Sequence, residues 1–122
     1  MAWTLQSDRP IYAQLVERLK TEIVSGVYPP GGRLPSVREL AATASVNPNT
    51  MQKALSELER SGLVYAQRTS GRFITEDEQM LKEMKKEQAS RHIAEFFEKM
   101  RSLGFRDEET LSLIEEAVKE EH

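Results

Sequence analysis

The segment from Leu34 to Ser61, LPSVRELAATASVNPNTMQKALSELERS, constrains the fold most, because it contains two helix starts separated by a very short connection. Ser36 and Glu39 have the spacing of a capping box, in which each side chain binds a backbone amide of the first helical turn. Asn47 followed by Pro48 predicts a second start, since asparagine caps free amides and proline needs no donor at the first helical position. We therefore expect one helix to begin at Ser36 and another at Asn47.

Both expected helices have an apolar face. Apolar residues recur every three or four positions in each of them, which is the periodicity of one face of a helix. These positions are Val37, Leu40, Ala41 and Ala44 in the first helix and Met51, Ala54, Leu55 and Leu58 in the second. Since only Ala44-Ser45-Val46 connects the two helices, their faces must pack together at a steep angle, which is a helix-turn-helix.

The front of the second helix has polar residues that a core does not require. In a DNA-reading helix-turn-helix, this part of the second helix enters the major groove. Asparagine and glutamine can pair with adenine, threonine can meet a base or the thymine methyl, and lysine neutralises phosphate. The residues are Asn47, Asn49, Thr50, Gln52 and Lys53. They are also compatible with an ordinary solvated helix surface, so the flanking segments decide between the two interpretations.

The charge of the chain is unevenly distributed. Its net charge is −3, which alone does not indicate a DNA-binding protein. Residues 1–76 have nine basic and seven acidic side chains, whereas residues 77–122 have eight and thirteen, so the two parts carry +2 and −5. Residues 33–72 have six basic against three acidic side chains. This local excess permits binding to a polyanion.

A first helix is expected before the helix-turn-helix. It follows an extended arm, begins at Pro10 and ends at Ser25-Gly26, since glycine is common just past a helix end. Its wide apolar stripe consists of Ile11, Leu15, Leu19 and Ile23, with Tyr12, Val16 and Val27 beside them. The next loop is rich in proline and glycine, and it leads to two arginines, Arg33 and Arg38, on either side of the capping box start.

A hairpin is expected after the helix-turn-helix, with strands at Leu63–Gln67 and Arg72–Thr75 and a turn at Arg68–Gly71. A small hairpin directly after three helices is the layout of a winged helix, whose wing lies along DNA. Arg68 and Arg72 would then contact phosphate or the minor groove. In the alternative interpretation, the hairpin only covers the hydrophobic core, through Leu63, Tyr65 and Phe73.

The order and spacing of these motifs resemble the GntR family of bacterial transcription regulators. The matching stretches are Pro10-Ile11-Tyr12, Gly26–Ala41, Val46–Thr50, Ala54-Leu55, Leu58-Glu59 and Gly62–Val64, followed by the wing. The resemblance implies a winged helix-turn-helix that binds a palindromic operator as a homodimer. By position, it places the DNA contacts on Arg33, Ser36, Arg38, Asn47, Asn49, Thr50, Gln52, Lys53, Arg68 and Gly71. In the family's wing a glycine usually follows the arginine directly, whereas here Thr69-Ser70 precede Gly71.

Residues 77–122 are expected to form a helical extension that dimerises the protein. A charged helix at Asp77–Glu87 is followed by an amphipathic stretch that ends at Gly104 and by a last helix that Asp107 caps. Two amphipathic helices bury too little surface to be stable alone, so the same pair from a second subunit would cover them. The expected interface residues are Ile93, Phe96, Phe97, Met100, Leu103, Leu111, Ile114 and Val118. This short extension resembles the YtrA-like subgroup of the GntR family.

Other interpretations rest on fewer residues. The Met and Phe stripe is also compatible with a small-molecule pocket, and His92 with Glu95 has the spacing of two metal ligands, although a dimer core and a solvated helix face account for them better. The chain has no Ser/His/Asp set and no Gly-rich phosphate loop, so we expect neither an enzyme nor a cofactor. A winged helix that binds protein or RNA remains as the alternative, but its surface would be more apolar.

The expected fold is mainly α with a small β-hairpin. It comprises a winged helix-turn-helix DNA-binding domain at residues 1–76, with the helix-turn-helix core at 36–61 and the wing at 63–75, and a dimerisation extension at 77–122. Cysteine, a basic-then-apolar N-terminus and long apolar runs are all absent, which indicates a cytoplasmic protein that does not enter membranes. We expect a homodimeric regulator, in this family often a repressor, that binds double-stranded operator DNA. The sequence identifies no small-molecule effector.

Overall fold

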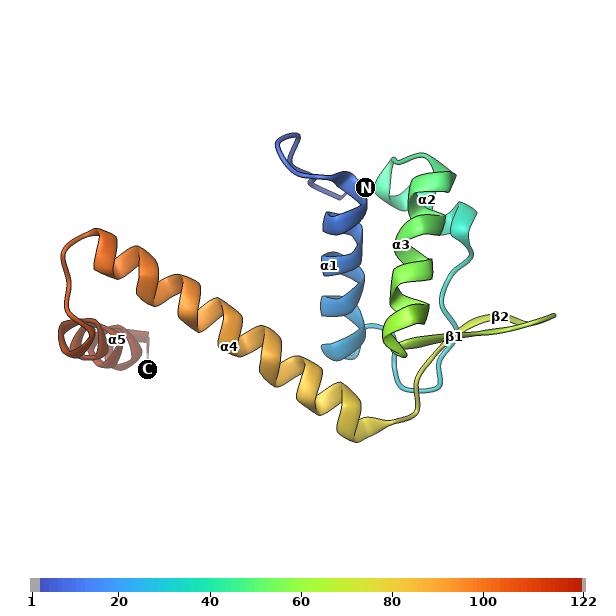
Figure 1. Cartoon of the computed structure of the whole chain (residues 1–122). Helices are drawn as coiled ribbons and strands as arrows, with labels where there is room; N and C mark the ends of the chain where they lie inside the picture. Colours follow the sequence, from blue (N-terminus) through green and yellow to red (C-terminus); the bar gives the residue numbers. More distant parts are fainter. Residues whose placement is uncertain (1–2, 122) are drawn as a thin grey trace. The chain divides into compact units, whose positions relative to one another are not determined.

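The computed structural model describes residues 3–121, in two compact units that meet at Lys85 and Lys86. Its helices are α1 (Ile11–Val24), α2 (Val37–Ala44), α3 (Pro48–Ser61), α4 (Glu78–Ser102) and α5 (Asp107–Glu121). Two strands, β1 (Val64–Gln67) and β2 (Gly71–Ile74), form an antiparallel hairpin. The described chain is therefore mainly helical with one small hairpin (Figure 1), which confirms the expected fold class.

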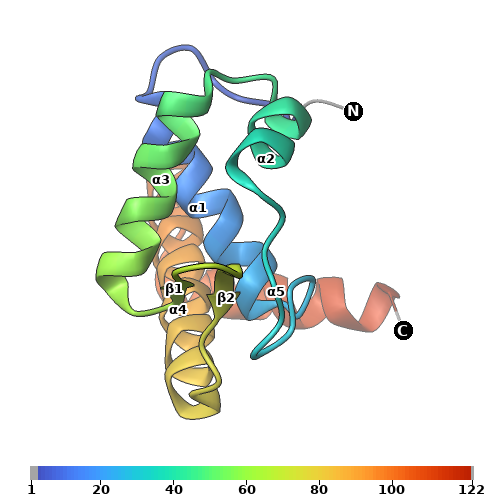
Figure 2. The same cartoon turned by 90° about the vertical axis from the view of Figure 1, so that its right-hand side faces the viewer.

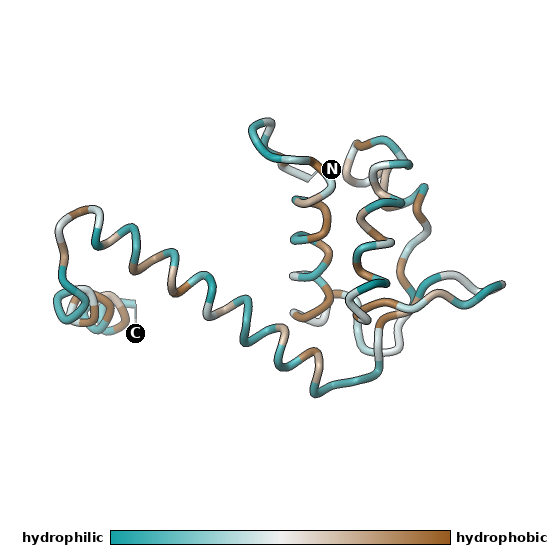
Figure 3. Tube along the Cα trace, in the orientation of Figure 1, coloured by the Kyte–Doolittle hydropathy of each residue, from teal (hydrophilic) through white to brown (hydrophobic). Residues whose placement is uncertain are grey.

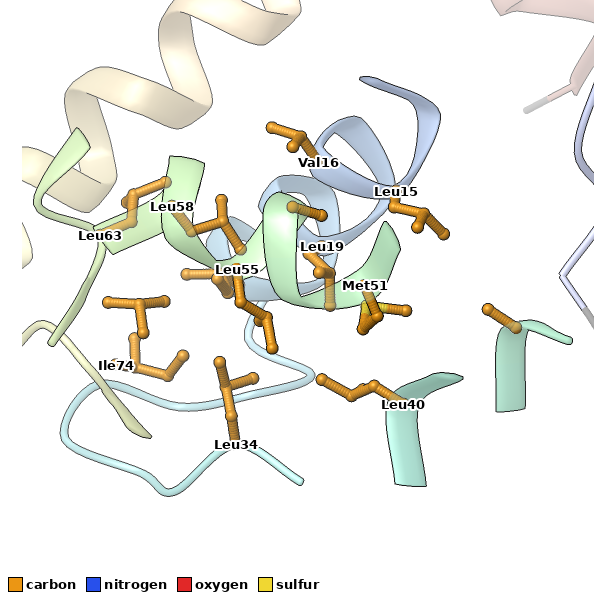
Figure 4. Close-up of a cluster of buried hydrophobic side chains, with 14 of the residues drawn as sticks. Leu15, Val16, Leu19, Leu34, Leu40, Met51, Leu55, Leu58, Leu63 and Ile74 are labelled. Atoms are coloured by element: carbon orange, nitrogen blue, oxygen red, sulfur yellow. The ribbon is translucent and has the colours of Figure 1, made fainter. Parts of the chain in front are cut away.

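The first unit packs three helices around one core. Helix α1 lies beside α3, and both helices begin at the same end of this unit (Figures 1 and 2). Leu15 and Leu19 of α1 and Leu55 of α3 are fully buried, and Figure 4 shows them among apolar side chains from the neighbouring elements. Val27, which was expected beside the α1 stripe, is 63% exposed because α1 ends at Val24 and the chain has already left the helix.

The two helix starts of the helix-turn-helix have the caps that the sequence predicts. Ser36 Oγ accepts a hydrogen bond from the Glu39 amide at 3.2 Å, and the Glu39 carboxylate accepts one from the Ser36 amide at 3.3 Å, which completes the capping box. Asn47 Oδ1 accepts from the Asn49 amide at 2.7 Å, directly before Pro48. Between the helices, Ser45 adopts a left-handed conformation, with φ of 57°, and this turns the chain sharply.

Removing the first of these caps is expected to destabilise the protein. Ser36→Ala deletes the acceptor for the Glu39 amide, which should lower the free energy of unfolding by about 1 kcal/mol. Thr43→Ala is the matched control, because the Thr43 hydroxyl donates to the Glu39 carbonyl inside the helix and caps nothing. Urea denaturation followed by circular dichroism measures both variants. Equal midpoints for the Ser36 variant and the parent protein would show that the box does not stabilise α2.

The hairpin is joined to the loop before α2. Val64 pairs with Ile74, and Gln67 pairs with Gly71 at the tip, so Gly71 belongs to β2 rather than to the turn. The Leu34 amide donates to the Arg72 carbonyl at 2.9 Å, and the Ile74 amide donates to the Gly32 carbonyl at 2.8 Å. The proline- and glycine-rich loop therefore runs along β2 and is hydrogen-bonded to it, which fixes the wing relative to the start of α2.

Helix α4 is one continuous helix of 25 residues. The sequence suggested a charged helix up to Glu87 and a separate apolar stretch from Ile93, but the residues between them include no glycine or proline that would end a helix. Leu81 in its second turn is buried in the core of the first unit, and Met80 and Met84 pack against that core. The first unit therefore extends past residue 76 to Lys85.

The second unit has almost no interior of its own. Within residues 86–121, Thr110 is the only buried side chain, and its hydroxyl has no hydrogen-bond partner. A turn at Gly104 leads from α4 into α5. Across this turn, Nε and Nη2 of Arg101 in α4 each donate to the carboxylate of Asp107, the first residue of α5, at 3.0 Å. These hydrogen bonds hold the pKa of Asp107 below its ordinary value. Within residues 86–121 no apolar side chain is buried, so the apolar residues of this unit remain open to a further surface that could cover them.

Candidate nucleic-acid interface

The front of α3 presents the polar side chains that the sequence singled out. Asn49, Gln52 and Lys53 are exposed, and Thr50 is half-buried. Asn47 is also exposed, but its side-chain oxygen accepts the hydrogen bond of the helix cap, so only its amide nitrogen remains to donate. Met51, Ala54 and Leu55 face the core from the other side of the same turns. The helix therefore separates an apolar inner face from a polar outer one at its N-terminal end.

The arginines of the described chain fall into two groups. Those of the first group each form an ion pair with an Asp or Glu side chain: Arg9, Arg18, Arg60, Arg72, Arg91, Arg101 and Arg106. Within residues 3–121, Arg33, Arg38 and Arg68 are exposed and form no ion pair or side-chain hydrogen bond. The sequence assigned DNA contacts to all three of these residues. Their positive charges are available to a polyanion, whereas each of the other arginines lies within 3.3 Å of a carboxylate that competes for it.

Arg33 lies against the wing. A Cβ atom added to Gly71 would sit 3.1 Å from Arg33 Nε, so the guanidinium passes over the face of this glycine. Gly71 has a φ of +102°, a conformation that other residues adopt only with strain. Arg33 also forms an isolated β-bridge with Phe73. The structure therefore brings together Arg33 from the loop and Gly71 from the wing, two of the residues expected to contact DNA.

Arg72 does not have the role that the sequence suggested for it. Its Nε donates to Glu59 Oε1 at 2.5 Å, and its side chain is only 20% exposed. The guanidinium therefore ties the wing to α3 and does not stand free at the tip. Tyr65, which was considered as a core residue, is 39% exposed and stacks on the Phe73 ring at 5.9 Å, while Leu63 is fully buried as expected.

The two wing arginines are therefore expected to differ in their effect on DNA binding. Arg68→Gln should weaken operator binding about fivefold, because it removes an unpaired charge from each subunit. A double variant, Arg72→Gln with Glu59→Gln, removes an ion pair without changing the net charge and should stay within about twofold of the parent protein. Fluorescence anisotropy with a DNA sequence selected by the protein measures both affinities. Equal losses in the two variants would contradict this distinction between the arginines.

Sequence reasoning missed one contact at this site. The Lys53 ammonium lies over the Tyr12 ring, 4.1 Å from its centroid, so a residue of α1 holds a residue from the front of α3. The sequence placed Tyr12 beside the apolar stripe of α1 and in a run that resembles the family, but gave it no part in DNA binding. A pair separated by 41 residues leaves no periodic signal in a sequence, because its members belong to different helices.

The apolar residues expected at a dimer interface all belong to the second unit, and five of the eight are exposed. The most exposed of them are Ile93 at 57%, Leu103 at 72% and Leu111 at 54%. Phe96 and Val118 are exposed as well, while Phe97, Met100 and Ile114 are half-buried. Figure 3 shows apolar residues recurring along both helices of this unit. Leu113, which was not among the expected residues, is 38% exposed.

No three His, Asp or Glu side chains in residues 3–121 come together as a metal-binding group. His92 is exposed on α4, and His122 lies outside the described residues. None of the described helices combines the length and the apolar character that crossing a bilayer requires.

Comparison with known proteins extends beyond the winged unit. The family model for bacterial regulatory proteins of the gntR family matches residues 11–74. The HTH-type transcriptional regulator YhcF of Bacillus subtilis is 39% identical over 109 residues, which cover 89% of this chain and 90% of YhcF. The HTH-type transcriptional repressor YtrA of the same bacterium is 44% identical over 72 residues, or 59% of this chain and 55% of YtrA.

Solved structures agree with these relatives. A GntR family transcriptional regulator from Listeria monocytogenes superposes with a TM-score of 0.84 at 36% identity, covering 92% of this chain and 98% of its own. The DNA-binding domain of AraR in complex with operator ORX1 superposes with a TM-score of 0.53 at 28% identity, covering 62% of this chain and 93% of its own. With a winged unit that matches the family model and relatives that match almost end to end, the chain belongs to the gntR family of bacterial DNA-binding transcription regulators.

Proposed function

We propose that the protein is a transcriptional repressor that binds a palindromic operator as a homodimer. The observation that carries this proposal is the distribution of paired and unpaired arginines. The unpaired arginines are Arg33 in the loop before α2, Arg38 in α2 and Arg68 in the turn of the wing. None of the three has an acidic partner within residues 3–121, whereas every other arginine is paired. Such free guanidinium groups can donate hydrogen bonds to phosphate oxygens of DNA.

In this proposal, α3 enters the major groove and the wing follows the flanking backbone. Asn49 and Gln52 have exposed carboxamides in the first turns of α3 and would meet base edges. Arg38 in α2 would contact a guanine or a phosphate at the edge of the same groove. Arg33 and Arg68 would contact DNA beside the wing. The remaining predicted contacts are Ser36, Asn47, Thr50, Lys53 and Gly71.

The second unit supplies the dimer in this proposal. Its apolar side chains occur at the spacing of one helix face, at Ile93, Phe96 and Met100 in α4 and at Leu103 directly after it. In α5, Leu111, Ile114 and Val118 have the same spacing. Pairing the two helices with their copies in a second subunit forms a four-helix interface that buries these faces. Residues 77–122 would thus be the dimerisation extension of a DNA-binding domain at residues 1–76.

Repression follows from where such a dimer would bind. A protein that occupies an operator near a promoter excludes RNA polymerase, and the relative YtrA is named a repressor. The structures of AraR with operator DNA support the use of this winged fold on double-stranded DNA. Because bacterial operators lie in the cytoplasm, the protein would act there.

Selection of bound DNA from a random library, followed by sequencing, tests this proposal. The full chain is expected to enrich two inverted half-sites whose centres are about one helical turn, or a multiple of it, apart. The selected sequence then serves as the operator DNA for all binding measurements. Enrichment of a single unrepeated site would contradict the symmetric dimer, and a lack of any enrichment would contradict sequence-specific binding.

A further inference from the structure

The contact between Tyr12 and Lys53 extends the candidate interface to α1. We propose that Tyr12 is a positioning residue for DNA binding, whose ring holds the Lys53 ammonium in place for a backbone phosphate. The inference rests on the proposed function, because it takes Lys53 to be a DNA contact. Its geometric basis is the 4.1 Å between the Lys53 nitrogen and the centroid of the Tyr12 ring.

The Tyr12 ring has a fixed position. The ring is half-buried against the core of the first unit, in the first turn of α1. The segment before α1 is tied down by Gln14, whose side chain is largely buried. Gln14 Oε1 accepts from the Gln6 amide at 2.7 Å, and Gln14 Nε2 donates to the carbonyls of Gln6 at 2.7 Å and Arg9 at 3.1 Å. The start of α1 is therefore held on both sides of Tyr12.

An aromatic ring holds a lysine without neutralising it. At the paired arginines of this protein a neighbouring carboxylate competes with phosphate for the guanidinium, whereas a ring face attracts the cation and leaves its charge unchanged. Lys53 forms no ion pair within residues 3–121 and is exposed. A free lysine side chain populates many rotamers, and ordering it on DNA costs conformational entropy. The ring lowers that cost before DNA binds.

A double-mutant cycle on operator DNA measures the coupling between the two residues. Tyr12→Leu is expected to weaken binding about fivefold, and Tyr12→Phe to stay within about twofold, because phenylalanine keeps a ring face for the cation. Lys53→Met should weaken binding more than Tyr12→Leu, since it removes the charge itself. In the Lys53→Met background, Tyr12→Leu should have no further effect. Additive losses, or tighter binding by the Tyr12→Leu variant, would overturn the inference.

Two further measurements separate positioning from a general effect on the fold. In the free protein, the Lys53 Hε protons should show an upfield ring-current shift with Tyr12 or Phe at this position and lose it with Leu. The control is Trp3→Leu, which also removes an aromatic ring from beside a cation, since Arg18 lies 4.8 Å from the Trp3 ring centroid. Arg18 belongs to α1 and not to α3, the helix that is expected to enter the groove. That variant is expected to keep the coupling between Tyr12 and Lys53. Unshifted Lys53 protons in the parent protein would overturn the contact.

The outcomes also distinguish this inference from the proposed function. If Lys53→Met binds the operator as tightly as the parent protein, Lys53 is not a DNA contact and the inference fails, while operator binding by the dimer stands. If the parent protein selects no operator from the random library, the proposed function fails. In that case the assignment of the contact to DNA binding is overturned as well, because there is no operator for Lys53 to contact. The ring-current shift still decides whether Tyr12 holds Lys53 in the free protein.

Discussion

Introducing glutamate at both Phe96 and Leu103 is expected to yield a folded monomer that binds operator DNA at least about 100-fold more weakly than the parent protein. The two side chains are 42% and 72% exposed on the second unit, so charges there do not disturb a core within one chain. In a dimer that buries this face, each charge would lie among apolar side chains, where it has no partner and costs much free energy. Sedimentation velocity and anisotropy titration measure the oligomeric state and the affinity.

The matched control places the same charges elsewhere on α4. Ala94→Glu with Ser102→Glu adds two carboxylates at exposed positions outside the apolar stripe, so this variant should remain a dimer with nearly unchanged affinity. Circular dichroism checks that both variants retain their helices. A Phe96 and Leu103 double variant that still sediments as a dimer would exclude this face of α4 from the interface.

Arg38→Ala has the second largest expected effect. If the guanidinium reads a guanine in two half-sites, its loss should weaken binding by about 1–3 kcal/mol per half-site and relax the sequence preference at one symmetric position. Arg60→Ala is the control, because Arg60 is 75% exposed but paired with Glu57 at 2.6 Å. Anisotropy titration against operators with all four bases at each position distinguishes base reading from phosphate contact. A uniform loss across the four bases would assign Arg38 to phosphate instead.

Features set by neighbouring residues were predictable from the sequence. The capping box at Ser36 and the Asn47-Pro48 start involve groups within four residues of one another, so their chemistry appears directly in the sequence. The apolar faces of α1, α2 and α3 followed from periodicity in the same way. The family resemblance, which rests on the order of these motifs, is confirmed by a match over residues 11–74.

Features set by distant residues were not predictable. The Arg72–Glu59 ion pair joins the wing to α3, and the Tyr12–Lys53 contact joins two helices, so neither pair has a fixed spacing. Whether an arginine is free or neutralised therefore required the structure, and this property separates Arg68 from Arg72. The continuity of α4 is a different case, because the sequence contained no helix-ending residue between its two halves.

We expect the unpaired arginines to face DNA, and the salt dependence of operator binding tests this most directly. A dimer of the Arg33→Gln, Arg38→Gln and Arg68→Gln triple variant lacks six charges. The plot of log affinity against log salt should therefore become less steep by about five if all six contact phosphate, and by about four if Arg38 reads a guanine instead. A control triple variant at Arg60, Arg91 and Arg106, all exposed and ion-paired, loses the same charge and should keep the parent slope. Equal slopes for the two triple variants would contradict the account.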